Sequence, residues 1–357
     1  MSDQPSRFRV RLTADFYSGT GEPKFQDMGL SVFEKHPHIQ CSAFAEHRKQ
    51  IGRDQIGDAN GLIVLTPAVT QESIAGADEL LAIGRFGVGY DAVDVEACTG
   101  ADVAVFITAG AVDRSVAEAT VGWMIALSHR VLAKDRLVRT GRWDERTGYM
   151  GCELRDRTFG AVGLGGIARE TIRLLEGFAM RRAIAFDPFV SDAEARSIGV
   201  TLVGLDELMA KADFVSVHCP LTRQTRGLIG PAQVGLMPPG SYLINTARGG
   251  IVDEDALYEA LKARRIAGAA LDCFTDEPVT TPSRFAALDN VLLAPHSIAW
   301  THELFRDIGT MACQGMVELS MGRVPRGVVN PEVLDRATFQ EKWDRLVRRE
   351  GTTALKG

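Results

Sequence analysis

The chain has 357 residues, which is long for a single hydrophobic core and favours two domains. Apolar residues make up 45% and charged residues 24%, as in ordinary globular proteins, and the net charge of −6 argues against a nucleic-acid-binding protein. No apolar run reaches the length of a membrane span, and the N-terminus lacks the apolar core of a secretion signal. We therefore expect a cytoplasmic protein with no membrane partner.

The six cysteines are scattered along the chain and include no C-x-x-C pair. This pattern predicts free thiols in a reducing compartment. It also predicts that the protein has no metal site.

The first hundred residues alternate between strand and helix patterns. Residues 24 to 35 have a helical pattern between the first two strand candidates. Alternation of this kind predicts an α/β domain with a parallel sheet, whose carboxyl strand ends face the ligand. The five predicted strands begin at Arg9, His38, Gly61, Leu80 and Val103.

The turn RFGVGYD, residues 85 to 91, follows the fourth predicted strand. Its two glycines expose backbone N–H groups, which could form a concave site for an anion. A plain turn between a strand and a helix is the alternative that this stretch leaves open.

A long amphipathic helix is predicted from Asp113 to Thr140. Asp113 and Ser115 are available as N-caps, and Gly141 is a stop signal. Its apolar residues cover more than one face, so we expect it to pack on both the second domain and a partner subunit.

The stretch FGAVGLGGIARETIRLLEGFAMRRAIAFD, residues 159 to 187, has the order strand, glycine turn, helix, strand and acid. Gly163 allows a tight turn, Gly165 allows a pyrophosphate to approach the backbone, and Ala168 allows close helix packing. Asp187 would accept both ribose hydroxyls and repel a 2′-phosphate. The stretch therefore predicts a dinucleotide site that prefers NAD, although a glycine turn alone would be weak evidence.

After this unit, four further buried strands are predicted, separated by helical patterns such as residues 253 to 263. The second domain is expected to span residues 112–300. A long helical pattern follows Thr301, and VVNPEVL from Val328 looks like a return to the first domain, which would then comprise 1–111 and 301–357. The segment from Phe339 to Glu350 is interpreted as a solvated surface helix. The four strands begin at Ala212, Gly240, Ala267 and Asn290.

Three of these strand ends lead into reactive residues, namely Arg248 in NTARGG, Glu277 in DEP and His296 in APH. Because the carboxyl ends of parallel strands meet at one edge, these side chains should converge beside a bound nicotinamide. Taken singly, each has a structural alternative, such as a surface ion pair or a satisfied histidine. His218 also ends a strand, and we expect it to have a minor role near the cofactor or none.

The chain resembles the D-isomer-specific 2-hydroxyacid dehydrogenases, a family that includes phosphoglycerate dehydrogenases and glyoxylate/hydroxypyruvate reductases. The resemblance covers nearly the whole chain past Gly61 and implies two Rossmann-like or flavodoxin-like α/β domains with parallel sheets, the first of them discontinuous. It rests on GRFGVGYDAVD, SVAEATVGWMIAL, GLGGIA, VHCPLTRQTRGLIG, INTARGGIVDEDAL, ALDCFTDEP, APHSIAW and VVNPEVL.

The resemblance also implies roles for individual residues. Arg248, Glu277 and His296 match the catalytic residues of the family, and the region 113–140 matches its homodimer interface. The substrate residues implied are Arg85, Val88, Gly89 and Arg248. The NAD-binding residues implied are Thr120, Gly163, Gly165, Gly166, Ile167, Asp187, His218, Ala247 and Asp272.

We therefore expect an NAD-dependent enzyme that moves a hydride between NAD and C2 of a small D-2-hydroxy or 2-oxo acid. Where phosphoglycerate dehydrogenases tend to place an arginine, this chain has Leu65, which predicts an unphosphorylated substrate. The alternative is an NAD-sensing scaffold or co-repressor of the same superfamily.

Overall fold

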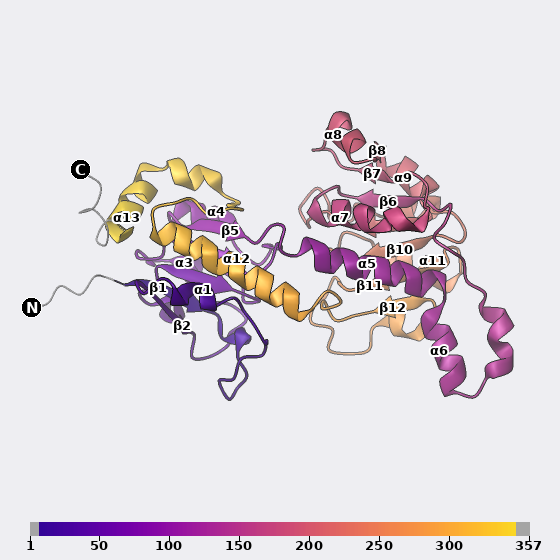
Figure 1. The fold of residues 1–357 in the computed structure, drawn as a ribbon, viewed down its shortest axis with the longest axis horizontal. Helices are drawn as coiled ribbons and strands as arrows, with labels where there is room; N and C mark the ends of the chain where they lie inside the picture. Colours follow the sequence, from indigo (N-terminus) through magenta and orange to yellow (C-terminus); the bar gives the residue numbers. More distant parts are fainter. Residues whose placement is uncertain (1–6, 348–357) are drawn as a thin grey trace, which may run out of the picture. The chain divides into compact units, whose positions relative to one another are not determined.

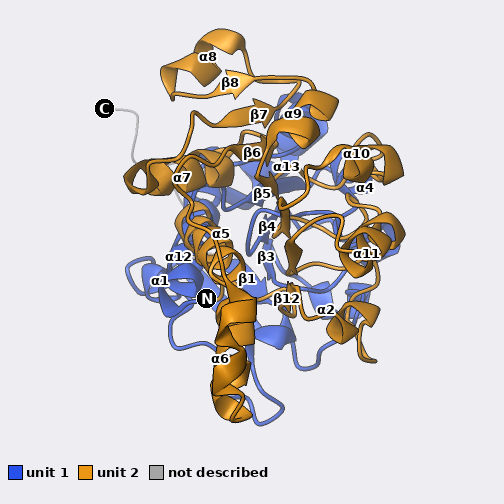
Figure 2. Ribbon diagram, turned by 90° about the vertical axis from the view of Figure 1, so that its right-hand side faces the viewer, with its two compact units in different colours: residues 1–112, 301–357 blue, residues 113–300 orange. Residues whose placement is uncertain are grey.

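The computed structural model describes residues 7–347, and the chain divides into two units. Unit 1 comprises residues 1–112 and 301–357, and unit 2 comprises residues 113–300 (Figure 2). Each unit is built around one parallel sheet, with five strands in unit 1 and seven in unit 2. The predicted fold class, α/β with two parallel sheets, is therefore confirmed.

The sheet of unit 1 has the strand order β2-β1-β3-β4-β5 (Figure 1). Each predicted strand run contains one of its strands. Because the strands are parallel, all five carboxyl ends lie at the same edge of the sheet. The strands are β1 (Phe8–Leu12), β2 (Ile39–Ala43), β3 (Gly61–Val64), β4 (Ala82–Arg85) and β5 (Ala104–Ile107).

Helices cover both faces of this sheet. One face packs against α2 (Arg53–Ile56), α3 (Gln71–Ile74) and α4 (Val95–Gly100) through a buried aliphatic cluster. The other face packs against α12 (His302–Ser320), where Met316 contacts the glycines of β3 and β4. Within residues 7–347, no helix is both long enough and apolar enough to cross a membrane.

The helix predicted over residues 24 to 35 is wrong in most of its length, because only α1 (Ser31–Glu34) is helical. Gly29 has a φ of 68°, and its amide donates to the carboxylate of Asp27. A Cβ at Gly29 would lie 2.1 Å from the backbone nitrogen of Thr310. This close approach to α12 requires a turn at Gly29, and the local helical pattern contains no sign of it.

The second part of unit 1 returns to β5, as predicted from VVNPEVL. Val328 pairs with Phe106, and the side-chain oxygen of Asn330 accepts the Val105 N–H at 2.8 Å. The turn η5 (Pro331–Asp335) then leads into α13 (Ala337–Val347).

The prediction of a solvated last helix is wrong for α13. Phe339 is fully buried, Trp343 is 7% exposed, and the Trp343 indole N–H donates to the Leu319 carbonyl at 2.9 Å. The two aromatic residues are four apart and therefore share one helix face, which the surrounding charges obscure in the sequence. The end of the predicted segment, residues 348–350, lies outside the described residues.

The sheet of unit 2 has the order β12-β11-β10-β9-β6-β7-β8, with every strand parallel. Sequence order reverses between β6 and β9, which makes this the point where ligands bind in open α/β sheets. The short edge strand β8 was not predicted. The strands are β6 (Phe159–Val162), β7 (Ile184–Phe186), β8 (Thr201–Leu202), β9 (Phe214–Val217), β10 (Tyr242–Asn245), β11 (Gly268–Leu271) and β12 (Val291–Leu293).

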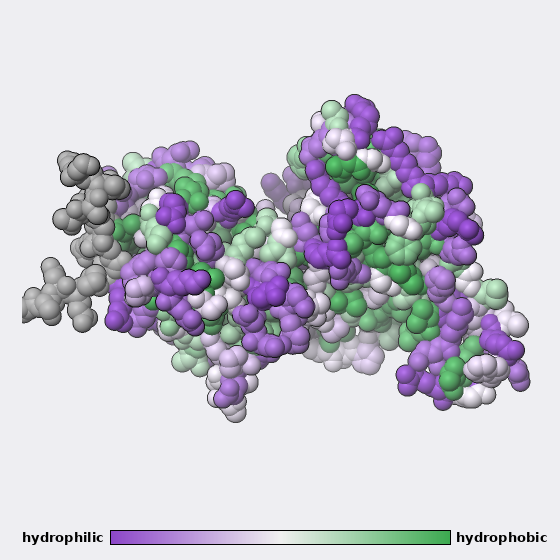
Figure 3. Space-filling model, in the orientation of Figure 1, coloured by the Kyte–Doolittle hydropathy of each residue, from purple (hydrophilic) through white to green (hydrophobic). Residues whose placement is uncertain are grey.

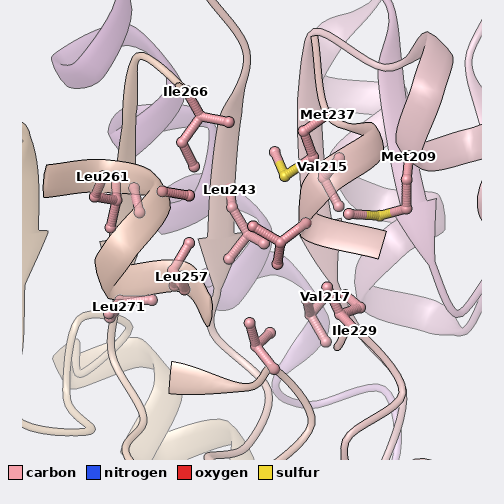
Figure 4. Packing of buried hydrophobic residues seen from close by; sticks show 14 of the residues in the cluster. Met209, Val215, Val217, Ile229, Met237, Leu243, Leu257, Leu261, Ile266 and Leu271 are labelled. Carbon is pink, nitrogen blue, oxygen red and sulfur yellow. The ribbon is translucent and has the colours of Figure 1, made fainter. Parts of the chain in front are cut away.

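Two buried clusters sandwich this sheet. One contains side chains of α5 (Asp113–Ser128) and α7 (Gly166–Leu174). The other, seen in Figure 4, joins α9 (Leu205–Lys211), α10 (Pro231–Leu236) and α11 (Glu254–Lys262) to the opposite face. With both faces covered, the strands read as continuous apolar runs, which is why the sequence predicts them well.

The long helix predicted from 113 to 140 is wrong, because it consists of two helices, α5 and α6 (Val131–Arg139). The chain breaks at Arg130, which has a left-handed backbone with a φ of 53°. At this break the carbonyl of Ser128 accepts the N–H of Cys152 at 2.9 Å. The prediction failed because arginine, unlike glycine, gives no sequence signal for a left-handed residue.

Candidate active site

His296 and Glu277 form a hydrogen-bonded pair in the loops that follow β12 and β11. Nδ1 of His296 lies 2.7 Å from Oε2 of Glu277, and Oε1 of Glu277 accepts the Phe274 N–H at 2.8 Å. Burial raises the pKa of Glu277, but the hydrogen bonds from His296 and Phe274 outweigh it and bring the pKa below its ordinary value. Glu277 is therefore ionised at neutral pH and fixes a proton on Nδ1, which leaves Nε2 for proton exchange.

The backbone around His296 is held by Asp272. The His296 N–H donates to the Asp272 carbonyl at 2.8 Å, and Oδ1 of Asp272 accepts the amides of Ser297 at 2.8 Å and Ile298 at 3.1 Å. Burial raises the pKa of Asp272, although these two amides oppose it. The φ of 54° at His296 shows that the loop holds an uncommon conformation, which fixes where the imidazole points.

Arg248 follows β10, the strand beside β11. The side chain of Asn245 closes the turn, donating to the Arg248 carbonyl at 2.8 Å and accepting the Ala247 amide at 3.0 Å. Nη1 of Arg248 donates to the Ala247 carbonyl at 2.7 Å, and its charge lowers the pKa of Glu277. The structure thus brings all three predicted catalytic residues to the ends of adjacent strands.

Cys273 belongs to the same cluster, and the sequence reasoning missed it. It is 2% exposed, and its thiol donates to the Ala247 carbonyl at 3.3 Å. Potential ligand atoms of Cys273, Glu277 and His296 all lie within 4.8 Å of one another. Because Glu277 and His296 bind each other directly, we interpret this group as an acid–base pair beside a thiol. The absence of a metal site stays a prediction.

The glycine turn after β6 fits a phosphate-bearing ligand. Gly163 has a φ of 96°, and a Cβ there would lie 2.8 Å from the Cys219 nitrogen, so only glycine fits without strain. A Cβ at Gly165 would have no atom within 4 Å, which leaves its backbone open to a ligand. Gly166 begins α7, with the partly buried Ile167 in its first turn and Ala168 fully buried against the sheet.

Asp187 directly follows β7, beside this turn. Its Oδ2 accepts the Leu164 N–H at 2.8 Å, and its Oδ1 accepts the Phe189 N–H at 2.9 Å. The carboxylate is therefore oriented by the glycine turn itself. The Phe189 side chain beyond it is 94% exposed.

Unpartnered polar atoms gather at the carboxyl edge of this sheet. Nε2 of His218 and Oγ1 of Thr246, next to Ala247, are buried and have no hydrogen-bond partner among residues 7–347. Burial lowers the pKa of His218 to about 4, so its ring is neutral at physiological pH. Such atoms favour a polar ligand here. The hydroxyl of Thr120, which is also fully buried, does have a partner, because it donates to the Val116 carbonyl at 2.8 Å.

The predicted substrate residues of unit 1 lie at the end of β4, which Arg85 closes, and in the turn after it. Nη1 of Arg85 donates to the carbonyls of Val64 at 3.1 Å and Phe86 at 2.6 Å. Gly87 turns the chain with a φ of 133°, and the partly buried Val88 and Gly89 follow it. These residues lie at the carboxyl edge of the sheet of unit 1.

Comparison with known proteins identifies the family. Residues 121–297 match the model of the D-isomer specific 2-hydroxyacid dehydrogenase, NAD binding domain. A glyoxylate reductase from Korarchaeum cryptofilum is 34% identical over 313 residues, which cover 86% of this chain and 94% of that protein. The chain belongs to the D-isomer specific 2-hydroxyacid dehydrogenase family. The matched segment lies inside unit 2, which therefore carries the NAD-binding domain of the family.

Other relatives have different names and lengths. A D-3-phosphoglycerate dehydrogenase from Archaeoglobus fulgidus is 40% identical over 272 residues, or 76% of this chain. This chain spans about half (51%) of the length of that relative. The structure of a glyoxylate reductase from Paecilomyes thermophila matches 92% of this chain and all of its own with a TM-score of 0.78 and 25% identity. The resemblance read from the motifs is thus confirmed, and the substrate differs between relatives.

Proposed function

We propose that this 2-hydroxyacid dehydrogenase family member transfers a hydride between NAD(H) and C2 of a small D-2-hydroxy or 2-oxo acid. The observation that carries the proposal is the 2.7 Å pair of His296 and Glu277, with Arg248 on the adjacent strand end. An acid–base histidine, its carboxylate partner and an anion-binding arginine are the groups that this reaction needs.

In this mechanism, the guanidinium of Arg248 binds the substrate carboxylate and polarises the oxygen on C2. During reduction, Nε2 of His296 donates its proton to that oxygen, so that C2 gains a hydride and the oxygen a proton. Glu277 accepts the Nδ1–H throughout and stabilises the imidazolium. Oxidation of the hydroxy acid reverses both transfers. NAD supplies the hydride acceptor or donor when bound.

NAD is the cofactor that fits the residues of unit 2. Gly163, Gly165, Gly166 and Ile167 would cradle the pyrophosphate at the start of α7. Asp187 would accept the ribose hydroxyls, which disfavours the 2′-phosphate of NADP. The remaining residues proposed to bind the cofactor are Thr120, His218, Ala247 and Asp272, of which Asp272 would hold the carboxamide.

The substrate is proposed to be unphosphorylated. The backbone amides of Val88 and Gly89 would bind its carboxylate, and Arg85 would contact its far end. A phosphate dianion held by one arginine, with Leu65 in place of a second, would lose a charge-assisted contact worth about 1.5–3 kcal/mol.

The test is a panel of 2-oxo acids assayed with NADH and NADPH, including glyoxylate, hydroxypyruvate, phenylpyruvate and phosphohydroxypyruvate. Turnover of at least one acid at ordinary enzymatic rates supports the dehydrogenase. NADH-dependent dimerisation with negligible turnover of every acid would instead support the scaffold or co-repressor. Phosphohydroxypyruvate as the best substrate would contradict the unphosphorylated assignment.

Arg85→Ala tests the assignment at the substrate's far end. If Arg85 contacts a tail, KM should rise about tenfold or more for the best tailed substrate. Glyoxylate has no tail to reach Arg85, so its KM should change little. Equal changes for both substrates would remove Arg85 from this role.

A homodimer is proposed through α5, α6 and the turn η2 (Trp143–Tyr149). Exposed apolar side chains cluster here, and Figure 3 shows hydrophobic surface over the region of α5 and at the tip of α6. Patches of this kind on a protein surface mark association sites. We keep the cytoplasm as the proposed compartment, because all six cysteines are free thiols. The exposed residues are Val131, Leu132, Val138, Trp143 and Met150.

A further inference from the structure

A buried carboxylate lies at the carboxyl end of β1, outside the residues used above. Asp15, in the turn η1 (Ala14–Phe16), is only 8% exposed. Its Oδ2 accepts both the N–H, at 2.9 Å, and the hydroxyl of Thr66. Its Oδ1 is buried and has no hydrogen-bond partner among residues 7–347. An unsatisfied carboxylate oxygen costs free energy, so a donor is expected from elsewhere.

The topology of the sheet places Asp15 where open α/β sheets commonly bind ligands. The order β2-β1-β3-β4-β5 reverses its direction of growth between β1 and β3. In open α/β sheets of this order, ligands bind beyond the carboxyl ends of the two strands at the reversal. Asp15 follows β1 and Thr66 follows β3, so their hydrogen bond spans this reversal. Thr66 is exposed, and Oδ1 of Asp15 beside it is buried.

Arg85 reaches the same strand end from the other side. Its Nη1 donates to the carbonyl of Val64, the last residue of β3 and two residues before Thr66. The ring of Phe16, next to Asp15, packs edge-on against Phe86, next to Arg85, with centroids 4.8 Å apart. These contacts bring the segments that carry Asp15 and Arg85 together at one edge of the sheet.

We propose that Asp15, held by Thr66, and Arg85 bind a hydroxyl group on the tail of the substrate. This inference rests on the proposed dehydrogenase function and specifies its substrate class. A hydroxyl can donate to Oδ1 of Asp15 and can also accept from a guanidinium N–H of Arg85. A phosphate is repelled by Asp15, and an ammonium group is repelled by Arg85. A methyl group can form neither hydrogen bond.

The test measures binding of D-lactate, D-glycerate and 3-phospho-D-glycerate to the NADH-loaded protein by calorimetry. No hydride can move in these complexes, so affinity is read without turnover. D-glycerate differs from D-lactate by one tail hydroxyl, and it should bind about tenfold more tightly or better. It should also bind more tightly than its phosphorylated form.

Asp15→Asn keeps an oxygen for the Thr66 amide and removes the charge. The preference for D-glycerate over D-lactate should fall about tenfold, and the rejection of 3-phospho-D-glycerate should weaken. The control is Asp58→Asn, an exposed carboxylate that pairs with Arg9 and Arg11 near the amino end of β3 and should leave both preferences unchanged.

Equal affinity of the parent protein for D-lactate and D-glycerate would overturn the tail site, and this comparison needs no variant. Tightest binding of 3-phospho-D-glycerate would do so as well. An unchanged preference in Asp15→Asn would remove Asp15 from the site. If none of the acids binds and no 2-oxo acid is reduced, the proposed dehydrogenase function itself is wrong and the tail site falls with it.

Discussion

The acid–base chemistry depends on one hydrogen bond, between Nδ1 of His296 and Glu277. The carboxylate is ionised at neutral pH, because its hydrogen bonds lower its pKa despite burial. Its charge stabilises the protonated imidazole, and the bond selects the tautomer of the neutral ring. One side chain therefore sets both the charge preference and the orientation of the other.

Glu277→Gln tests this dependence. Removing the charge destabilises the imidazolium, so reduction, which needs protonated His296, should be lost at a lower pH than in the parent. Oxidation, which needs the neutral ring, should persist to lower pH. The measurement is the pH profile of kcat/KM in both directions, with His296→Ala as the reference that loses about a hundredfold or more in kcat. Superimposable profiles for the parent and Glu277→Gln would exclude this role.

The predicted preference for NADH over NADPH depends on Asp187. Its carboxylate is oriented by the Leu164 and Phe189 amides beside the glycine turn, where a 2′-phosphate would meet its negative charge. We expect a higher kcat/KM with NADH than with NADPH. Asp187→Ser should lower the ratio of kcat/KM with NADH to kcat/KM with NADPH, chiefly by raising KM for NADH. Equal use of both cofactors by the parent enzyme would contradict this assignment.

Among the structural elements, the segment from β6 to β7 depends closely on the conformation of the glycine turn at Gly163. Gly163→Ala should destabilise the protein by about 1–3 kcal/mol, because the backbone has a φ of 96° and the added carbon would meet the Cys219 nitrogen. Gly177→Ala is the matched control, since its Cβ would meet no atom within 4 Å. Denaturant midpoints measured without cofactor compare the two. Similar midpoints for both variants would show that the turn tolerates a side chain.

Several features of the fold and of the site could be predicted from the sequence. The central strands and the turn after β6 were predictable because buried parallel strands are continuous apolar runs and glycine marks sharp turns. The convergence of Arg248, Glu277 and His296 was predictable because the carboxyl ends of parallel strands share one edge.

Features set by long-range contacts were not predictable. The turn at Gly29 depends on the backbone of α12, and the break at Arg130 depends on a residue type that rarely adopts a left-handed backbone. The surroundings of Cys273 and Asp15 likewise come from segments far away in the sequence. Asp15 belongs to no motif, and the motif ALDCFTDEP points to Glu277 rather than to Cys273, so the roles of both residues become visible only in the folded chain.

At the scale of the whole molecule, the proposed dimer makes a direct prediction. The protein should have twice the 38.7 kDa mass of one chain in light scattering at micromolar concentration. The double variant Val138→Asp, Trp143→Ser should shift it toward the single-chain mass, because a charge would be buried in the interface. Val324→Asp, at another exposed apolar residue, is the control and should leave the mass unchanged. An unshifted mass in the double variant would place the interface elsewhere.

The division of unit 1 into two stretches of sequence has a consequence for synthesis. When residues 1–112 have left the ribosome, the face of β3 and β4 that receives Met316 of α12 is still uncovered, and β5 lacks its contacts with Val328 and Asn330. Unit 2 is continuous from residue 113 to 300, so its sheet and both helical layers emerge before α12 does. The nascent chain should therefore complete unit 2 first. Until α12 is synthesised, the strands of unit 1 keep apolar surface exposed, and chaperones bind chains in this state.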